Sequence, residues 1–127
     1  MSVDFKDNVP IYLQIMQDIK NQIAAGKLHE KDKVSSVREL ALYYGVNPNT
    51  IQKALSELER EGLMKSERTL GRFISIDDEK IKDIKKHLAL ETTYEYLNNI
   101  KEIGYSKDEI LELIKEVTKD EQWNYCN

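Results

Sequence analysis

The sequence predicts a mainly α-helical protein with one short β hairpin, and three observations carry this prediction. Residues 35–62 read as two short helices joined by a very short turn. Residues 63–76 read as two short strands on either side of a glycine-containing turn. Residues 77–119 return to the apolar spacing of helices, with one interruption at Gly104.

The two helices of residues 35–62 each begin at a recognisable cap. Ser36 and Glu39 match the capping box, in which a serine and a glutamate three residues later bond each other's backbone amides. Asn47 is a suitable N-cap for the second helix, and Pro48 is tolerated next because the first helical position needs no N–H donor. Two short helices across a tight turn form a helix-turn-helix, which presents the start of its second helix outward.

The outward face of the second helix is polar. Amides, hydroxyls and lysines are side chains that hydrogen-bond base edges and phosphates in DNA. Any small helical domain also needs a solvated face, so the helix pair alone leaves both interpretations open. The outward positions are Asn49, Thr50, Gln52, Lys53 and Ser56.

The hairpin that follows is predicted to be a wing. Its strands are expected at Leu63–Glu67 and Arg72–Ile76, and Gly71 can supply the positive φ that the turn requires. Arg68 and Arg72 flank the tip, where guanidinium groups could reach phosphates or the minor groove. A surface hairpin with two ordinary arginines is the alternative. The order of helix, turn, helix and basic-tipped hairpin favours the wing.

Five segments resemble the winged-helix domain of GntR-family bacterial transcription factors. They are residues 10–15 (PIYLQI), 23–28 (IAAGKL), 36–41 (SVRELA), 45–51 (GVNPNTI) and 54–63 (ALSELEREGL). The resemblance covers about residues 9–76, and the short helical remainder resembles the smallest branch, the YtrA-like regulators. It implies a transcription regulator that binds double-stranded DNA as a homodimer, with repression as the expected mode and transporter-type genes as the targets by analogy.

The resemblance also implies which residues meet DNA. Ser36 and Arg38 stand where the family's serine and arginine contact the DNA backbone and bases, and a salt bridge with a neighbouring carboxylate is the alternative for Arg38. Gly71 stands at the wing-tip glycine. The full set expected at DNA is Ser36, Arg38, Asn47, Asn49, Thr50, Gln52, Lys53, Arg68, Gly71 and Arg72.

Several positions depart from the family pattern. Ser35 replaces a common proline, which should only loosen the entry to the helix. Pro48 replaces a common arginine, so one expected DNA contact is absent. Leu70 and Arg72 lie in a wing that is usually richer in glycine and threonine, and Arg72 could compensate for the cation lost at Pro48. The operator should therefore differ from the common family half-site.

The net charge of −4 is unusual for a DNA-binding protein. Residues 1–76 contain 11 Lys and Arg against 10 Asp and Glu, whereas residues 77–127 contain 8 against 13. Because phosphate attraction supplies most non-specific DNA affinity, binding should depend on dimerisation and on the placement of a few cations. The alternative is a winged helix that binds protein instead of DNA. Scattered cations would favour that alternative, whereas convergence of Arg38, Lys53, Arg68 and Arg72 on one surface would oppose it.

The chain is expected to comprise a winged helix-turn-helix domain over residues 1–76 and a helical dimerisation region over residues 77–127. A helix from Pro10 to about Ala25 should support the helix-turn-helix from behind. The C-terminal region should hold a long helix to Ile103 and a shorter one after a second capping box, Ser106 to Glu109.

Two helices of this length cannot enclose a core of their own, so the C-terminal region is expected to pack on a second copy of the chain. Packing back on the winged helix of the same chain is the alternative, and Trp123 and Tyr125 could fold back on the helices. The residues expected at the homodimer interface are Ile84, Leu88, Tyr94, Leu97, Ile110, Leu113 and Ile114.

Other functions find little support in the sequence. His29, His87 and Cys126 have no metal-ligand or nucleophile spacing, and there is no phosphate-binding glycine loop, so neither an enzyme nor a cofactor is expected. No apolar run approaches the length of a membrane span, and the first ten residues do not resemble a secretory signal. A cytoplasmic protein is therefore expected. Any small-molecule effector would have to use the dimer cleft or the junction near residues 76–90.

Overall fold

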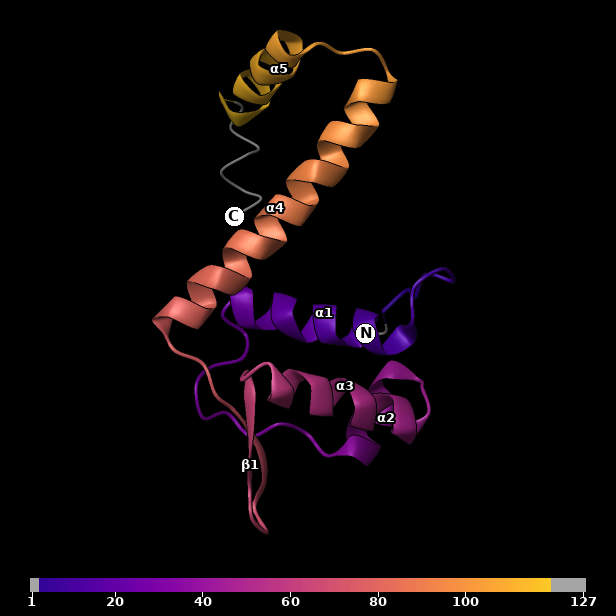
Figure 1. Ribbon diagram of the computed structural model, residues 1–127, viewed down its shortest axis with the longest axis vertical. Coiled ribbons are helices and arrows are strands. Elements are labelled where there is room, and N and C mark those ends of the chain that lie inside the picture. The colour runs from indigo at the N-terminus through magenta and orange to yellow at the C-terminus, as the bar shows by residue number, and fades with distance from the viewer. Residues whose placement is uncertain (1–2, 120–127) are drawn as a thin grey trace. The chain divides into compact units, whose positions relative to one another are not determined.

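The computed structural model describes residues 3–119, so Trp123, Tyr125 and Cys126 lie outside the described residues (Figure 1). The chain divides into two compact units, Met1–Leu88 and Ala89–Asn127, and each is described by itself. The first unit contains α1 (Ile11–Ala24), α2 (Val37–Tyr44), α3 (Pro48–Arg60), β1 (Met64–Glu67) and β2 (Gly71–Ile74). Helix α4 (Asp78–Glu102) begins in the first unit and continues into the second, which also contains α5 (Lys107–Lys119).

Helix α3 forms the centre of the first unit. Helices α1 and α2 and strand β1 all pack against it, as Figure 1 shows for the helices. Its apolar residues Ile51, Leu55 and Leu58 recur on one helical face and are at most 1% exposed. They meet Ile15 and Ile23 of α1, which are at most 2% exposed, in one hydrophobic core. The predicted helix-turn-helix with a supporting first helix is confirmed.

Several helix ends are capped by a residue of the type that favours the cap. Gly45 ends α2 in the left-handed conformation at φ 68°. The Asp77 side chain accepts a hydrogen bond from the amide of Lys80 (2.8 Å) and so caps α4. The second capping box is also formed, because the amide of Ser106 donates to Glu109 (2.9 Å) and the amide of Glu109 donates to Ser106 Oγ (3.3 Å).

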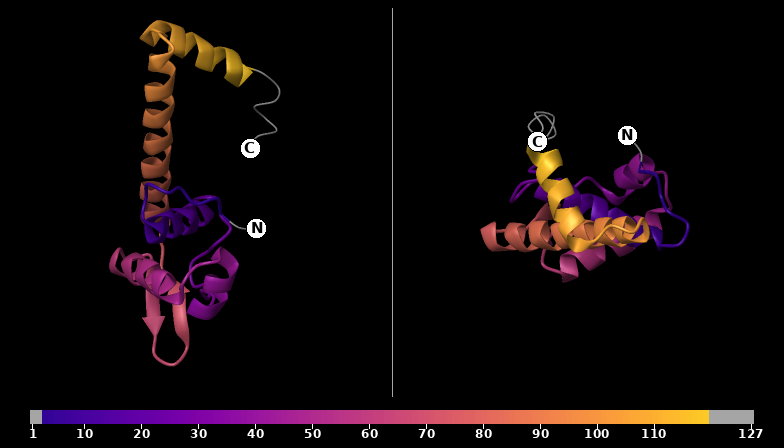
Figure 2. Two further views of the ribbon diagram at one scale, coloured as in Figure 1. Left: turned by 90° about the vertical axis from the view of Figure 1, so that its right-hand side faces the viewer. Right: turned by 90° about the horizontal axis from the view of Figure 1, so that it is seen from above.

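The wing is a two-stranded antiparallel hairpin that projects beyond the helices of the first unit (Figure 2). Met64 pairs with Ile74 at its base, and Glu67 pairs with Gly71 near its tip. The sequence analysis did not predict that the connector, residues 28–35, would run along β2. The amide of Ile74 donates to Asp32 O (2.8 Å), and the amide of Val34 donates to Arg72 O (2.9 Å). The connector therefore acts as a partial third strand.

The first turns of α4 belong to the core of the first unit. Ile84 is 9% exposed within that core, and Ile81 and Leu88 pack against it. The Lys80 ammonium donates to Gly62 O (2.9 Å) at the end of α3. The predicted dimer residues Ile84 and Leu88 are thus covered within their own chain, as in the alternative for this region. The sequence cannot indicate whether an apolar residue near a unit boundary packs into its own unit or against a second copy of the chain.

The second unit buries little apolar surface in its described part, residues 89–119. Ile110 is 6% exposed, and Leu97 and Leu113 are partly buried. Gly104, at φ 94°, ends the turn after α4, and α5 then leads away from it (Figure 2). The large side chains that remain exposed are Leu90, Tyr94, Ile103, Tyr105, Leu111, Ile114 and Val117. Across residues 3–119, no helix is both long and apolar enough to cross a membrane.

Candidate nucleic-acid interface

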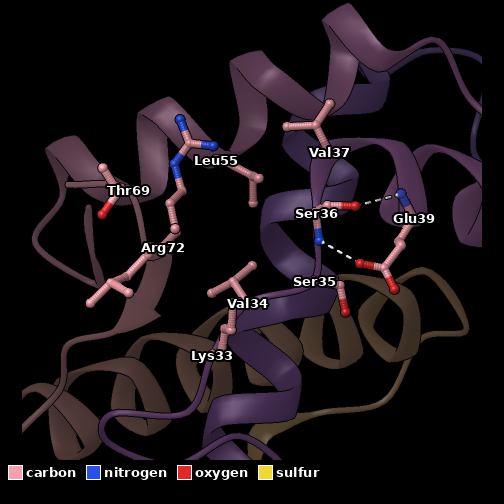
Figure 3. Close-up of a pocket in the computed structure, with 11 residues that line it drawn as sticks. Lys33, Val34, Ser35, Ser36, Val37, Glu39, Leu55, Thr69 and Arg72 are labelled. Atoms are coloured by element: carbon pink, nitrogen blue, oxygen red, sulfur yellow. Dashed lines mark hydrogen bonds between the residues drawn. The ribbon is translucent and has the colours of Figure 1, made fainter. Parts of the chain in front are cut away.

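Reciprocal hydrogen bonds hold the start of α2. Ser36 Oγ accepts from the amide of Glu39 (3.1 Å), and the amide of Ser36 donates to Glu39 Oε1 (3.0 Å), as Figure 3 shows. These hydrogen bonds hold the pKa of the Glu39 carboxyl below its ordinary value. The amides of Val37 and Arg38 have no hydrogen-bond partner among residues 3–119. Unpaired N–H groups at a helix N-terminus attract anions such as phosphate.

Arg38 lies in the same first turn and is exposed. Its guanidinium forms neither an ion pair nor a hydrogen bond within the described part of the chain. The salt bridge considered as an alternative in the sequence analysis is therefore not formed. Arg38 offers an unneutralised cation beside unpaired amides, which suits a bidentate contact with a phosphate.

Helix α3 presents the predicted polar face. The Asn47 side-chain oxygen accepts from the amide of Asn49 (2.8 Å), so Asn47 caps the helix and only its side-chain nitrogen remains to donate to a ligand. Gln52 donates to Ser56 (3.3 Å) one turn further along. Thr50 is only partly exposed, whereas Asn49, Gln52, Lys53 and Ser56 are exposed.

Lys53 lies against an aromatic ring that the sequence analysis did not connect with it. Its ammonium is 4.4 Å from the centroid of the Tyr12 ring on α1. A cation at this distance is attracted to the face of the ring. Tyr12 is itself partly buried against the core, so α1 positions the Lys53 cation at the edge of the recognition face. No local sequence pattern could indicate this pair, because its members belong to different helices.

The wing tip has an unusual backbone. Thr69 adopts φ 67° and Gly71 adopts φ 107°, so two of the three residues 69–71 have positive φ. Positive φ is uncommon for a β-branched residue and stores strain in the backbone. Leu70 between them is 61% exposed. The exposed Arg68 precedes them and forms no ion pair within residues 3–119.

Arg72 differs from the other predicted cations because a carboxylate neutralises it. Its Nε donates to Glu59 Oε1 of α3 (3.2 Å), and the Arg72 side chain is 20% exposed. Ser66 Oγ donates to the same oxygen (2.8 Å). The Ser66 hydrogen bond, followed by Arg72, holds the pKa of Glu59 below its ordinary value. Arg72 thus ties the wing to α3, and its expected contact with DNA stays a prediction.

The start of α2 and the wing enclose a cavity of about 570 Å³, which we call the front cleft (Figure 3). It brings together three predicted residues, Ser36, Gly71 and Arg72. Lys33 of the connector also lines it and was missed by the sequence analysis. Residues 31–34 read Lys-Asp-Lys-Val and show no strand periodicity, so no local pattern could have indicated that the connector pairs with the wing. Hydroxyls, amides and cations in this arrangement can bind a phosphate.

The predicted cations do not all line this cleft. Arg72 does, whereas Lys53 lies over Tyr12, and Arg38 and Arg68 are exposed at the start of α2 and at the wing tip. No cluster of three or more metal-binding side chains occurs within residues 3–119. The connector histidine, His29, pairs with Asp32 (3.3 Å).

A capped polar recognition helix, a supporting three-helix core and a hairpin wing define the winged helix-turn-helix class of DNA-binding protein. Residues 11–74 match the family described as bacterial regulatory proteins, gntR family. The chain belongs to this GntR family and is a helix-turn-helix DNA-binding transcriptional regulator, not an enzyme.

Two Bacillus subtilis proteins are similar to the chain over nearly its full length. The uncharacterized HTH-type transcriptional regulator YhcF is 40% identical, over 94% of this chain and 98% of its own length. The HTH-type transcriptional repressor YtrA is 34% identical, over 94% of this chain and 93% of its own length. The predicted resemblance to the short YtrA-like branch is confirmed.

Solved structures agree with the fold. A GntR family transcriptional regulator from Listeria monocytogenes aligns with a TM-score of 0.77 and 34% identity, over 88% of this chain and 98% of that one. The DNA-binding domain of AraR in complex with operator ORX1 aligns with a TM-score of 0.54 and 28% identity, over 59% of this chain and 95% of that one.

Proposed function

We propose that the chain is a repressor that binds a palindromic operator as a homodimer. The observation that carries the dimer is the apolar surface of the second unit. Leu111, Ile114 and Val117 of α5 are 48%, 42% and 55% exposed, and Tyr94 of α4 is 63% exposed. Exposed apolar side chains at three-residue spacing along one helix, as at Leu111, Ile114 and Val117, indicate an interface. A second copy of the same unit would cover these side chains with a self-complementary patch.

The proposed dimer interface spans a shorter part of the chain than the sequence analysis expected. Ile84 and Leu88 are already covered by the winged helix of their own chain, so we place the interface on residues 89–119. Of the expected interface residues, Tyr94 and Ile114 are exposed and Leu97 and Leu113 partly buried, whereas Ile110, at 6% exposed, is already buried within its own unit. Leu90, Ile103, Leu111 and Val117 join them because their side chains are exposed.

A twofold dimer would also compensate for the weak DNA affinity expected from the small net charge of residues 1–76. Residues 1–76 have nearly balanced charges, with 11 basic against 10 acidic residues. Phosphate contacts provide much of DNA affinity, so one such head would bind weakly. Two heads on half-sites about one helical turn apart would double the contacts. The AraR domain, which is solved on an operator, supports double-stranded DNA as the partner.

Repression and the kind of genes regulated are inferred from similarity to other proteins. The similar YtrA protein is named a transcriptional repressor. Control of transporter-type genes follows only from the family resemblance. Two observations favour the competing candidate, a winged helix that binds protein. The predicted cations do not all line one cleft, and Leu42 and Tyr43 of α2 are 79% and 48% exposed. The unpaired amides and free arginine at the start of α2 favour DNA.

The proposal is tested by fluorescence anisotropy and by light scattering on the purified full chain. The DNA is the fragment upstream of the chain's own gene, with a scrambled fragment of equal length as control. We expect tight binding to the native fragment, weak binding to the scrambled one, and the mass of a dimer. Equal and weak binding to both fragments would overturn the operator assignment and leave the protein-binding alternative. The mass of a monomer at micromolar concentration would overturn the dimer.

A further inference from the structure

A second cavity, of about 320 Å³, lies within the first unit and adjoins the front cleft at the connector. We call it the rear cavity. Residues from four elements, α1, the connector, α2 and the wing, line it. They include Ile19 and Gln22 of α1, Leu28 of the connector, Leu40 of α2, and Met64 and Ile74 of the wing.

The rear cavity and the front cleft share a wall. Lys33, Val34, Ser35 and Glu39 line both cavities. This wall leads directly into Ser36, the cap of α2, and it is hydrogen-bonded to β2 through Val34 and Arg72 (2.9 Å). A change in the position of the wall would therefore move the start of α2 and the wing together. Both elements belong to the candidate nucleic-acid interface.

The lining specifies the chemistry of an occupant. Half of the lining side chains are apolar and two more are tyrosines, and the apolar Ile19, Met64 and Ile74 are at most 4% exposed. Lys33 and Glu39 at the shared wall carry opposite charges, so no net charge favours an ion. Gln22 donates through its nitrogen to Asp18 (3.0 Å), whereas its side-chain oxygen has no hydrogen-bond partner among residues 3–119. That oxygen is an acceptor available to a bound molecule.

The volume limits the size of the occupant. An apolar cavity of about 150 Å³ accommodates benzene, and ligand sites in proteins begin at about 300 Å³. A cavity of about 320 Å³ therefore suits a molecule of roughly two fused rings.

We propose that the rear cavity is an effector site for a small, neutral, bicyclic aromatic molecule with one hydrogen-bond donor, which Gln22 accepts. This proposal rests on the proposed function, since the response it controls is operator binding. The molecule would act by binding the DNA-competent and DNA-incompetent positions of the shared wall with different affinities. This location differs from the dimer cleft and from the junction near residues 76–90, where the sequence led us to expect an effector.

The binding test uses the full chain with labelled isoleucine and leucine methyl groups and indole as the probe. We expect saturable shifts of the Ile19, Leu40 and Ile74 methyl signals in ¹H–¹³C spectra. Benzothiophene, which has the shape of indole without its N–H, should bind about threefold to tenfold more weakly. Absence of saturable shifts, or shifts spread equally over α5, would overturn the proposal.

Two variants locate the site. Leu28→Phe fills the cavity and should abolish the indole shifts, whereas the same substitution at the exposed Leu13, outside the cavity, should leave them unchanged. Gln22→Met removes the acceptor, so indole and benzothiophene should then bind alike. If Leu28→Phe does not fold, Gln22→Met alone tests whether indole binds in the rear cavity. Unchanged preference for indole in Gln22→Met would overturn the role of Gln22.

The coupling test measures operator affinity by anisotropy with and without saturating indole. We expect the dissociation constant to change by about fivefold or more, in either direction. Indole binding with unchanged operator affinity would overturn the effector role. If the chain without indole fails to distinguish its promoter fragment from scrambled DNA, the proposed function fails instead, and the methyl titration still decides whether the cavity binds.

Discussion

Replacing Arg38 by alanine should weaken operator binding and flatten its dependence on salt. Arg38 is exposed and forms no ion pair within residues 3–119, and its own amide and that of Val37 are unpaired at the start of α2. Such a site binds phosphate, and the guanidinium would supply its charge. In the proposed homodimer each complex contains this contact twice, so the substitution removes two phosphate contacts.

The magnitude follows from counterion release. Each neutralised phosphate contributes about −0.9 to the slope of log K against log salt, so two lost contacts should reduce the slope by about 1.8. Between about 50 and 200 mM salt, the variant should therefore lose roughly tenfold less affinity than the parent. At the low-salt end, the parent should bind about tenfold or more tightly than the variant, since a hydrogen bond to a charged group contributes on the order of 1.5–3 kcal/mol.

The assay is fluorescence anisotropy with the promoter fragment across this salt range, and Lys27→Ala is the matched control. Lys27 is an exposed cation of the same unit that lines neither cavity. It should change neither the slope nor the affinity beyond a small uniform effect. A slope for Arg38→Ala equal to that of the parent would refute the phosphate contact. Equal changes for both variants would show that only total charge matters.

Three further predictions concern the dimer and the fold. Ile114→Glu should convert the dimer to a monomer in light scattering, because a charge cannot be buried unpaired at an apolar interface; a persistent dimer would place the interface elsewhere. Tyr44→Phe should lower the free energy of unfolding in urea by about 1–2 kcal/mol, because the Tyr44 hydroxyl donates to the Asp18 carboxylate (2.7 Å), and an unchanged midpoint would contradict this role. The Glu39 pKa is lowered from 4.5 in the folded state, so its ionised form stabilises the protein above about pH 4.5, and this contribution is lost as the pH falls through the lowered value. Glu39→Gln should therefore flatten the acid side of the stability profile, and a profile as steep as the parent's would exclude this contribution.

Each of these variants has a matched control. Asn98→Glu adds the same charge at another exposed position of the second unit and should leave the dimer intact. Tyr43→Phe removes a hydroxyl from the neighbouring, half-exposed tyrosine and should leave the urea midpoint unchanged. Glu67→Gln neutralises an exposed carboxylate whose side chain has no hydrogen bond among residues 3–119, and it should leave the acid profile unchanged.

The sequence predicts the secondary-structure elements better than it predicts the interactions within the candidate site. The winged helix-turn-helix, its caps and the exposed polar face of α3 could be predicted from the sequence. Whether each predicted cation forms an ion pair within the chain could not be predicted from the sequence. Arg72 and Arg68 both flank the wing tip in sequence, yet Arg72 pairs with Glu59 (3.2 Å) and Arg68 forms no ion pair within residues 3–119. Pairing depends on which carboxylate lies opposite in space, and no local pattern records that distance.

The sequence by itself determined the order of the helices and strands and the helix caps, whereas the strand expected at Arg72–Ile76 is Gly71–Ile74 in the structure. Caps such as Ser36 with Glu39, and stop signals such as Gly45, act over three or four residues, so neighbouring side chains specify them. Only the tertiary structure decided that the connector pairs with β2, that Tyr12 holds Lys53, and that Ile84 joins the first core. These contacts join residues far apart in the chain. Their energies depend on packing and on hydrogen-bond geometry, which exist only once the elements have come together.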